Sequence, residues 1–519
     1  MQVTSEALAD RIRSLPARMS HVVDPWAQGN PGADALIEGE RRLSYGHLAE
    51  AVAAIGGWLR ERGVRGGDRV MVVGENCIAL AVLILAIGDI DAWPLVANAR
   101  LSEREVDSIQ THSGSRLQLF TSAVSADAAR HASRLGASAQ KLPWIGQVGV
   151  GVTADGALPE PVSVEGPRQV GALIYTSGTT GAPKGVMLSH HNILFTAAVG
   201  GVLRDLKADD RVYGVLPMSH IVGFSSVLIG TLMFGACLEL VPRFDAAATL
   251  TALRARRITR LQGVPTMYQR LLEVSGGRVE CPALRTIGVA GAPLDESLKG
   301  AVEAAFGRVL HNGYGITECS PTIAFTRLHD PRKDTSVGPS IPGIEVRLVD
   351  PELGPSGNPL TPDAVGELHV RGPNVMLGYY KAPDLTASAI DPDGWFNTGD
   401  LARFDGPCLH IVGRTKELII RSGFNVYPPE VEAVLASHPA VAGCAVVGRK
   451  VLGNEEVVAF VQLRVGSIAS AQDITAFAAQ RLAPYKRPSE VILRQTLPAT
   501  SAGKILKHQL AKEASQHEQ

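Results

Sequence analysis

The chain has 519 residues, with 50 Lys and Arg against 51 Asp and Glu, a net charge of −1 and 19% charged side chains. A chain of this length exceeds what one hydrophobic core supports, so two or more domains are expected. Because the charge is balanced and no basic run occurs, the composition argues against nucleic acid as a partner.

The cysteines are scattered, with no CxxC motif and no Cys/His cluster. This spacing favours reduced thiols in a cytoplasmic protein and argues against structural zinc. The first residues, Met-Gln-Val-Thr-Ser-Glu, lack the basic-then-apolar order of a secretory signal. We therefore expect a cytoplasmic location. The six cysteines are Cys77, Cys237, Cys281, Cys319, Cys408 and Cys444.

One uncharged stretch, Ile221 to Leu238, has the length of a membrane span. It contains several glycines and hydroxyl side chains, follows Ser219 and His220, and has no Lys/Arg cluster on either side. We expect a buried helix running into a strand here, and no integral membrane segment.

Hydrophobic periodicity predicts alternating helices and strands in the first half of the chain. Apolar residues recur at helical spacing from Leu48 to Leu59, and Gly63 ends the pattern. The alternation of strands and helices that follows is typical of a mostly parallel sheet. Residues 134–170 are expected to form a loose connection. The predicted strands are 69–73, 92–96 and 115–122, with a buried helix at 77–88; alternation resumes from 173 to about 312.

The second half changes character. Short strands and turns over residues 331–400 predict a small β-rich subdomain. The last hundred residues predict a small mobile α+β domain, which begins beside the charged, turn-prone run 413–417. The fold class is therefore α/β, with a multi-subdomain N-terminal domain, 1–415, and a C-terminal domain, 416–519. The C-terminal elements expected are a helix from Pro428 to about Leu435, strands at 441–448, 457–463 and 491–493, and a helix at 474–482.

A segment rich in glycine and hydroxyl groups links two strands near residue 180. It runs from Thr176 through Gly181 to Pro183 and Lys184. Glycines admit backbone N–H groups to a polyanion, hydroxyls donate hydrogen bonds, and the lysine supplies a point charge. A nucleotide P-loop is excluded because Gly185, not Ser or Thr, follows the lysine. We interpret the segment as a phosphate-binding loop; a solvated turn is the alternative.

Two later segments suit the rest of a nucleotide. Small residues from Gly288 to Leu294 follow an apolar strand and would let a flat ligand lie against the backbone. Glycines on both sides of Tyr314 would expose its ring for stacking on a purine. Thr317 offers a phosphate donor, and Glu318 offers a carboxylate of the kind that Mg²⁺ prefers. Ordinary turns are the alternative for both segments.

Three single residues are ambiguous when taken alone. Asp400 ends a turn and is suited to ribose hydroxyls, with Arg414 nearby in the sequence. Lys504 follows Gly503 and reads either as a surface lysine or as a cation that a mobile domain delivers to a developing negative charge. His220 is either a core histidine or a gate beside an apolar pocket.

Together and in this order, the segments resemble the adenylate-forming superfamily of acyl- and aryl-CoA synthetases, luciferases and peptide-synthetase adenylation domains. The resemblance covers about Leu43 to Lys507 and looks closest to the branch of 4-coumarate, malonate and medium-chain CoA ligases. The motifs that carry it are Tyr175 to Gly185, Tyr314 to Glu318, Thr398 to Asp400, Gly413 to Glu417, and Gly503-Lys504.

The resemblance implies an ATP-dependent carboxylic acid–CoA ligase that forms AMP and pyrophosphate. The acid attacks the α-phosphate of Mg·ATP to give an acyl-adenylate; the small domain then rotates and CoA displaces AMP. The implied co-substrates are ATP and CoA, and the implied cofactor is Mg²⁺. A ligase that loads a carrier protein and a nucleotide-binding protein without chemistry are the alternatives, and a homodimer is left open.

The resemblance also implies roles for individual residues. Lys504, His220, Glu318 and Thr176 would be catalytic, and Glu318 and Thr176 would hold the metal. ATP and AMP would be bound by Thr176, Ser177, Gly178, Thr179, Thr180, Lys184, Gly291, Ala292, Pro293, Asn312, Gly313, Tyr314, Thr317, Asp400, Arg414 and Lys504. His220, Val222, Ser226, Ala290 and Gly313 would line the acyl pocket, Lys416 would be the hinge, and Gly423 would meet CoA.

Two departures from the family pattern stand out. Residues 418–422 are less basic than in plant-type ligases, which leaves the CoA contacts there open, and Ala290 stands where relatives often have glycine.

The segment after His220 also bears on the acid. It offers no carboxylate to pair an ammonium, which disfavours amino acids because an unpaired buried charge is costly. A malonate-type dicarboxylate would need a cation, and the sequence does not place Arg243 or Arg270 inside the pocket. We expect an apolar or aromatic monocarboxylic acid.

Overall fold

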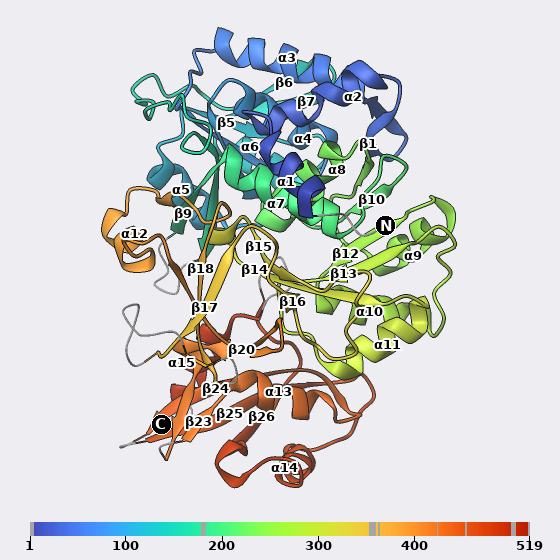
Figure 1. Cartoon of the computed structure of the whole chain (residues 1–519), viewed down its shortest axis with the longest axis vertical. Helices are drawn as coiled ribbons and strands as arrows, with labels where there is room; N and C mark the ends of the chain where they lie inside the picture. The colour runs from blue at the N-terminus through green and yellow to red at the C-terminus, as the bar shows by residue number, and fades with distance from the viewer. Residues whose placement is uncertain are drawn as a thin grey trace.

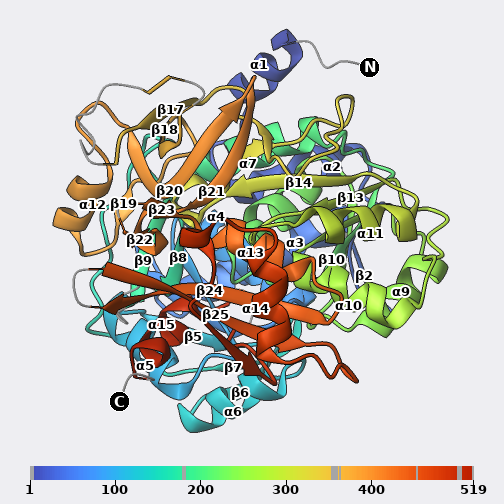
Figure 2. The same ribbon diagram turned by 90° about the horizontal axis from the view of Figure 1, so that it is seen from below.

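A computed structural model describes residues 5–177, 183–351, 360–361, 364–422, 424–451, 454–499 and 505–516. The chain forms a large α/β part, with the red C-terminal elements gathered at the lower end of the molecule (Figure 1). Viewed from below, the C-terminal sheet and its helices lie in front of the larger part (Figure 2). This arrangement confirms the predicted fold class.

The largest sheet has eight strands in the order β15-β14-β13-β12-β10-β11-β1-β2. All neighbours from β14 to β1 are parallel, whereas β15 and β2 run antiparallel at the two edges. The carboxyl ends of the parallel strands therefore meet at one edge, where ligands of open α/β sheets bind. The strands are β1 Asp34–Glu38, β2 Arg41–Ser44, β10 Arg211–Gly214, β11 Cys237–Leu240, β12 Arg260–Gly263, β13 Thr286–Val289, β14 Leu310–Gly315 and β15 Thr322–Phe325.

A second sheet has the order β4-β3-β5-β7-β6, with three parallel strands extended by an antiparallel hairpin. The hairpin corrects the expectation of a loose connection over residues 134–170 for its first part only, since residues 151–169 contain no helix or strand. Leu142, Ile145 and Val148 in the hairpin are buried. Burying these apolar side chains stabilises the hairpin despite the glycines and prolines in this stretch. The strands are β3 Arg69–Gly74, β4 Trp93–Asn98, β5 Leu117–Phe120, β6 Ser138–Leu142 and β7 Gly146–Val150.

Helix α4, Ile78–Asp89, is apolar on every side and contacts strands of both sheets, β1 as well as β3 and β4. Its neighbour α3, Tyr45–Glu61, confirms the predicted amphipathic helix. The other helices of this part are α1 Ser5–Arg13, η1 Met19–Val22, α2 Asp24–Gly29, α5 Glu103–Ser113, α6 Ala126–Arg134, α7 His190–Leu203, α9 Ala246–Ala255, α10 Pro265–Ser275 and α11 Glu296–Phe306.

The uncharged stretch forms a buried helix followed by a strand, as expected. A π-helix, η2 at Val222–Ile229, continues into α8 at Gly230–Met233 and then into β11. Across the residues described, none of the helices combines the length and the apolar character that crossing a membrane requires.

Two further sheets complete the large N-terminal part. One has the order β19-β9-β8, and the other is the antiparallel β16-β21-β20-β18-β17, which confirms the predicted β-rich subdomain. The elements are β8 Val170–Ser177, β9 Pro183–Ser189, β16 Gly338–Pro339, β17 Glu345–Val349, β18 Gly366–Arg371, β19 Gly378–Tyr379, α12 Pro383–Ala389, β20 Phe396–Asp405 and β21 Cys408–Arg414.

The C-terminal part is built on the sheet β24-β25-β26. Side chains of α13 and α14 belong to one core cluster on this sheet, and those of α15 belong to another. Helix α14 lies about three residues before its predicted position. The elements are η5 Thr415–Glu417, β22 Ile419–Arg421, β23 Phe424–Val426, α13 Pro428–Ala436, β24 Val441–Val451, β25 Asn454–Leu463, α14 Ala471–Ala479, η6 Pro484–Lys486, β26 Glu490–Arg494 and α15 Lys507–Gln516. The boundary at 415/416 stays a prediction and falls within η5.

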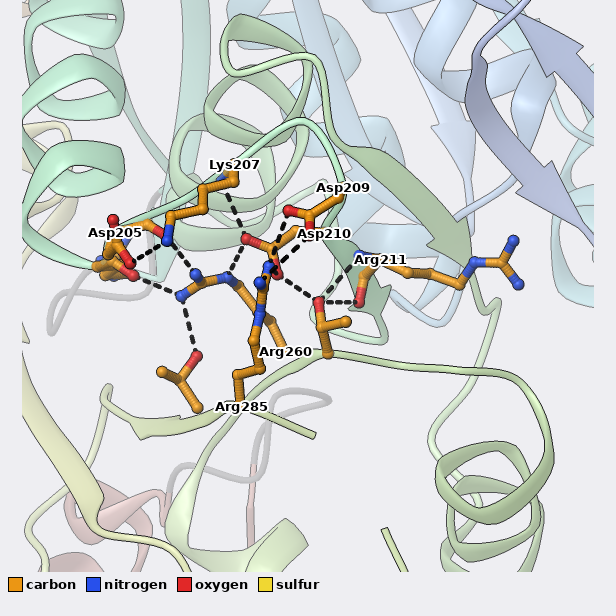
Figure 3. Close-up of polar contacts among 10 residues, drawn as sticks. Asp205, Lys207, Asp209, Asp210, Arg211, Arg260 and Arg285 are labelled. Atoms are coloured by element: carbon orange, nitrogen blue, oxygen red, sulfur yellow. Dashed lines mark hydrogen bonds and ion pairs between the residues drawn. The ribbon is translucent and has the colours of Figure 1, made fainter. Parts of the chain in front are cut away.

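A polar network links the amino ends of β10, β12 and β13. These ends lie at the edge of the sheet opposite the carboxyl ends of the strands. Buried Asp210 binds the guanidinium groups of Arg260, at 2.6 Å, and of Arg285 (Figure 3). The backbone N–H of Lys207 donates to the same carboxylate at 2.9 Å. These bonds satisfy a charge that would be costly to bury alone, and they anchor the three strands that carry the candidate site.

Candidate active site

The predicted phosphate loop joins two paired antiparallel strands. Thr176 on β8 lies opposite Lys184 on β9, and Ser177 lies opposite Pro183. Gly178, Thr179 and Thr180 fall outside the described residues. A strand–loop–strand hairpin differs from the strand–loop–helix of a P-loop, in agreement with the missing Ser or Thr after Lys184.

Tyr314, Asp400 and Arg414 form one hydrogen-bonded group. The Tyr314 hydroxyl donates to Asp400 Oδ2 at 2.5 Å, and Arg414 Nε lies 2.8 Å from Asp400 Oδ1. Asp400 and Arg414 are cross-strand partners on β20 and β21, while Tyr314 comes from β14. Burial and the nearby Asp400 charge raise the pKa of Tyr314, so its hydroxyl remains a donor. The negative charge of Asp400 likewise raises the pKa of Arg414.

Glu318 lies in the short turn η3, Thr317–Cys319, directly after β14. Its Oε1 accepts from the Tyr379 hydroxyl at 2.9 Å, and its backbone carbonyl accepts from Met376 N–H at 2.8 Å. Its Oε2 makes no hydrogen bond to any residue in the part of the chain that the structure describes. β9, which carries Lys184, contacts η3. A carboxylate such as that of Glu318 and a hydroxyl such as that of Thr176 are hard oxygen donors of the kind that Mg²⁺ prefers.

A second group of possible metal ligands, Asp334, Asp405 and His410, already holds a cation. Arg332 lies 2.5 Å from an Asp334 oxygen and 2.9 Å from an Asp405 oxygen. The guanidinium therefore takes the position that a metal would need.

The segments proposed for adenine lie at the carboxyl ends of β13 and β14. Gly291 has a φ of +87°, which favours glycine, and Ala292 and Pro293 complete the same turn. Asn312 donates its side-chain amide to the Thr335 carbonyl at 2.8 Å. A Cβ at Gly313 would lie 3.0 Å from the Phe325 ring, so a larger residue would crowd this edge.

The loop that carries His220 is fixed by Asn76, a buried residue just after β3. Its side-chain amide donates to the carbonyls of Gly214, at 2.9 Å, and Leu216, at 2.8 Å, and accepts from Met218 N–H at 2.8 Å. Sequence reasoning missed Asn76, although two polar residues, Glu75 and Asn76, at the carboxyl end of an apolar strand are a usable signal.

The predicted acyl pocket contains two buried polar atoms, His220 Nε2 and Ser226 Oγ, that have no hydrogen-bond partner among the described residues. Burial, with a smaller contribution from the positive charge of Arg100, lowers the pKa of His220, so the imidazole is neutral near pH 7. Val222 and Tyr314 are half-buried against the main hydrophobic core. Ala290, at the carboxyl end of β13, donates its N–H to the Gly263 carbonyl.

The predicted hinge, Lys416, is exposed in the middle of η5. Its neighbour Thr415 donates to Glu367 Oε1 at 2.7 Å, and Asn397 donates to Glu367 Oε2 at 2.7 Å. Lys504 and Gly423 fall outside the described residues. Sequence reasoning also missed Glu367, Thr415 and Tyr379, because their partners are distant in the chain.

Two family profiles match the sequence. The AMP-binding enzyme profile matches residues 23–380, and the AMP-binding enzyme C-terminal domain profile matches residues 430–504. Feruloyl-CoA synthase of Amycolatopsis sp. is 36% identical over 486 residues, covering 93% of this chain and 96% of that protein. Indoleacetate–CoA ligase of Aromatoleum aromaticum is 34% identical over 500 residues, covering 94% and 96%.

Solved structures give the same assignment. ATP-bound MatB from Rhodopseudomonas palustris has a TM-score of 0.85 and 28% identity, covering 97% of this chain and 100% of that chain. O-succinylbenzoate CoA synthetase from Bacillus subtilis, in complex with ATP and magnesium ion, has a TM-score of 0.80 and 28% identity, covering 94% and 99%. The chain therefore belongs to the AMP-binding enzyme family, within the adenylate-forming superfamily, and is an AMP-forming acid–thiol ligase.

Proposed function

We propose that this ligase joins an aromatic monocarboxylic acid with a polar ring substituent to CoA, through an acyl-adenylate. The observation that carries the proposal is the π-helix after His220, a mostly apolar element in which the buried hydroxyl of Ser226 has no hydrogen-bond partner among the described residues. An aromatic ring would fill the apolar space, and its polar group would satisfy a hydroxyl that is costly to leave unpaired.

The charges around this segment support a monocarboxylate. Arg243 is bound to Glu75, at 2.7 Å, and to Asp127, at 2.5 Å. Arg270 is exposed and pairs with Glu273, at 3.0 Å. Both arginines that were considered for a second carboxylate are thus engaged with carboxylates of the protein, which disfavours a malonate-type substrate.

Two relatives point in the same direction. Feruloyl-CoA synthase and indoleacetate–CoA ligase, by their names, act on acids that carry an aromatic ring. We extend that substrate class to this chain because both proteins match it over nearly their whole length.

At the nucleotide, we propose that Thr176, Ser177, Gly178, Thr179, Thr180 and Lys184 hold the β- and γ-phosphates. Glu318 and Thr176 would hold Mg²⁺, which when bound neutralises phosphate charge. Glu318 can do so with Oε2 while Oε1 stays bonded to Tyr379. Thr317 would meet the α-phosphate.

Adenine would lie between Tyr314 and the turn Gly291 to Pro293, with Asn312 and Gly313 beside it. Asp400, which is held by Tyr314 and Arg414, would accept the ribose hydroxyls with its carboxylate oxygens. Lys504 would stabilise the negative charge that develops as the carboxylate attacks. Lys416 would act as the hinge and Gly423 would approach CoA.

We also propose a cytoplasmic location and keep a homodimer as an alternative to a monomer. The six cysteines form no disulfide within the described chain, and five of them are buried, which fits a reducing compartment.

The test is AMP release from ATP over a panel of aromatic, aliphatic and dicarboxylic acids, with and without CoA, alongside Lys504→Ala. We expect the fastest release, with thioester formed, for a ring-substituted aromatic acid, and loss of adenylation in the variant. Preference for an aliphatic or dicarboxylic acid would contradict the substrate proposal. Acyl-adenylate that accumulates while CoA stays unused would favour a carrier-protein acceptor.

A further inference from the structure

The short segment Met376 to Tyr380 lies between the Glu318 turn and the Lys184 strand. On one side Met376 N–H donates to the Glu318 carbonyl at 2.8 Å. On the other side β19 pairs with β9, so that Tyr379 lies opposite Val186. The Tyr379 N–H donates to Thr386 Oγ1, in the middle of α12, at 2.9 Å. Hydrogen bonds to η3, β9 and α12 therefore hold the backbone of this segment.

The Tyr379 side chain contacts both proposed nucleotide-binding groups. Its hydroxyl lies 2.9 Å from Glu318 Oε1, and Lys184 Nζ lies 5.7 Å from the ring centroid, within cation–π range. The side chain is 9% exposed, so water competes weakly for these contacts. Burial and the Glu318 charge raise the pKa of Tyr379, so the hydroxyl remains a donor near neutral pH.

Glu318 needs such a partner because a half-buried glutamate can otherwise adopt several side-chain rotamers. Most of these rotamers would move the carboxylate oxygens away from the position that binds a metal. The Tyr379 hydroxyl fixes one oxygen, and the other makes no hydrogen bond within the described residues. In metal sites, partners of this kind orient the ligating carboxylates and tune their affinity.

We propose that Tyr379 is a positioning residue for metal-bound ATP. It orients the Glu318 carboxylate and fixes the position of that carboxylate relative to the Lys184 ammonium group. The proposal rests on the ATP site of the proposed function. Tyr379 touches neither substrate nor metal and acts through Glu318.

The chain supplies a matched control in the next residue. Tyr380 is also buried, at 4% exposed, and its hydroxyl donates to a carboxylate, Glu160 Oε1, at 2.6 Å. Tyr380→Phe therefore removes the same kind of bond, one residue away, without touching Glu318 or Lys184. Any general cost of losing a buried tyrosine–glutamate bond appears in both variants.

The experiment measures ATP dissociation constants by calorimetry for the wild type, Tyr379→Phe and Tyr380→Phe, once with Mg²⁺ and once with EDTA. We expect Tyr379→Phe to reduce the Mg²⁺-dependent gain in ATP affinity about tenfold. Metal-free ATP binding should stay unchanged, and Tyr380→Phe should keep the wild-type gain. Equal gains in the two variants would overturn the positioning role. Absence of any gain in the wild type would instead contradict the proposed ATP site, and with it this inference.

A double-mutant cycle with Glu318→Gln separates positioning from a general structural effect. If Tyr379 acts through the carboxylate, Tyr379→Phe should change the Mg²⁺-dependent gain far less in the Glu318→Gln background than in the wild type. Fully additive losses would mean that Tyr379 acts independently of Glu318 and would overturn the proposal. Thermal unfolding of all variants identifies any that fail to fold.

Discussion

The two ends of the candidate site are built differently. The nucleotide end contains two hydrogen-bonded groups, Tyr314–Asp400–Arg414 and Glu318–Tyr379, each held by charge-assisted hydrogen bonds of 2.5–2.9 Å. The acyl end, comprising His220, Val222 and Ser226, has apolar surroundings and two buried polar atoms without partners in the described chain.

This difference matches what each end must recognise. ATP is the same in every reaction, so groups held in advance by the protein lower the cost of arranging them around it. The acid varies within the family. A buried hydroxyl in an apolar space favours acids that can form a hydrogen bond with it over acids that cannot. Changes at the nucleotide end should therefore affect all acids equally, and changes at the acyl end should alter the ratio between acids.

The largest effect is expected from Asp400→Asn. The amide cannot accept from Tyr314, Arg414 and the ribose as a carboxylate does, and the lost charge leaves Arg414 uncompensated. We predict a loss of about 3 kcal/mol, or about 100-fold in kcat/KM for ATP, for every acid. Asp405→Asn, at the far exposed end of β20, is the matched control and should leave kcat/KM within twofold. A loss of kcat/KM confined to one acid would contradict the expectation that changes at the nucleotide end affect all acids equally.

Gly223→Ala should disturb the acyl end nearly as strongly. A Cβ at Gly223 would lie 2.1 Å from the Pro217 carbonyl oxygen, so the π-helix or the His220 loop must shift. We predict a decrease of about 2–3 kcal/mol in the free energy of unfolding, with a raised KM for the acid, measured by denaturant unfolding and steady-state kinetics. Gly57→Ala in α3 meets no atom within 4 Å and serves as the control. Equal stability of the two variants would contradict the close packing.

His311, a buried histidine on β14 three residues before Tyr314, predicts a pH dependence of stability. Burial and the Lys299 charge lower the pKa of His311 to about 4, from an ordinary value of 6.5. Between these values the unfolded chain binds a proton that the folded chain does not, so stability falls as pH decreases from 6.5 to 4. We predict a contribution of ~2 kcal/mol over this range.

The measurement for this prediction is the unfolding temperature as a function of pH. Burial also lowers the pKa of His190 to about 4, so His311→Gln should reduce the slope of the curve between pH 6.5 and 4 without removing it. His329→Gln, at an exposed position, should leave the curve unchanged. A wild-type curve that is flat over this range would contradict the buried neutral state.

The smallest effect concerns Ser226→Ala. Losing one hydroxyl should cost about 1 kcal/mol, close to fivefold in kcat/KM, for an aromatic acid with a ring hydroxyl. The same acid without the hydroxyl should react as well as with the wild type, or slightly better. Competition between the two acids in one reaction measures the ratio directly.

The sequence was informative where chemistry depends on residue type within a short segment. The order of glycines, hydroxyls and Lys184, and the Tyr314 to Glu318 motif, indicated a nucleotide before any contact was known. It was uninformative where partners are distant: 61 positions separate Tyr379 from Glu318 and 86 separate Tyr314 from Asp400. Tertiary packing brings these pairs together: β14 and β20 belong to different sheets, and Glu318 lies in the turn η3 rather than in a strand. The β6–β7 hairpin was missed because β6 is mostly polar and exposed and two glycines interrupt β7, so neither strand shows an alternation of apolar residues.

The most direct test compares a variant at the nucleotide end with a variant at the acyl end in the same assay. Acid-dependent AMP release is followed for Asp400→Asn and Ser226→Ala with one aromatic acid that carries a ring hydroxyl and the same acid without it. We predict that Asp400→Asn lowers both rates by the same factor and keeps their ratio, while Ser226→Ala changes the ratio about fivefold. An unchanged ratio in Ser226→Ala, or a ratio that shifts in Asp400→Asn, would contradict the division of the site into a fixed nucleotide end and a discriminating acyl end.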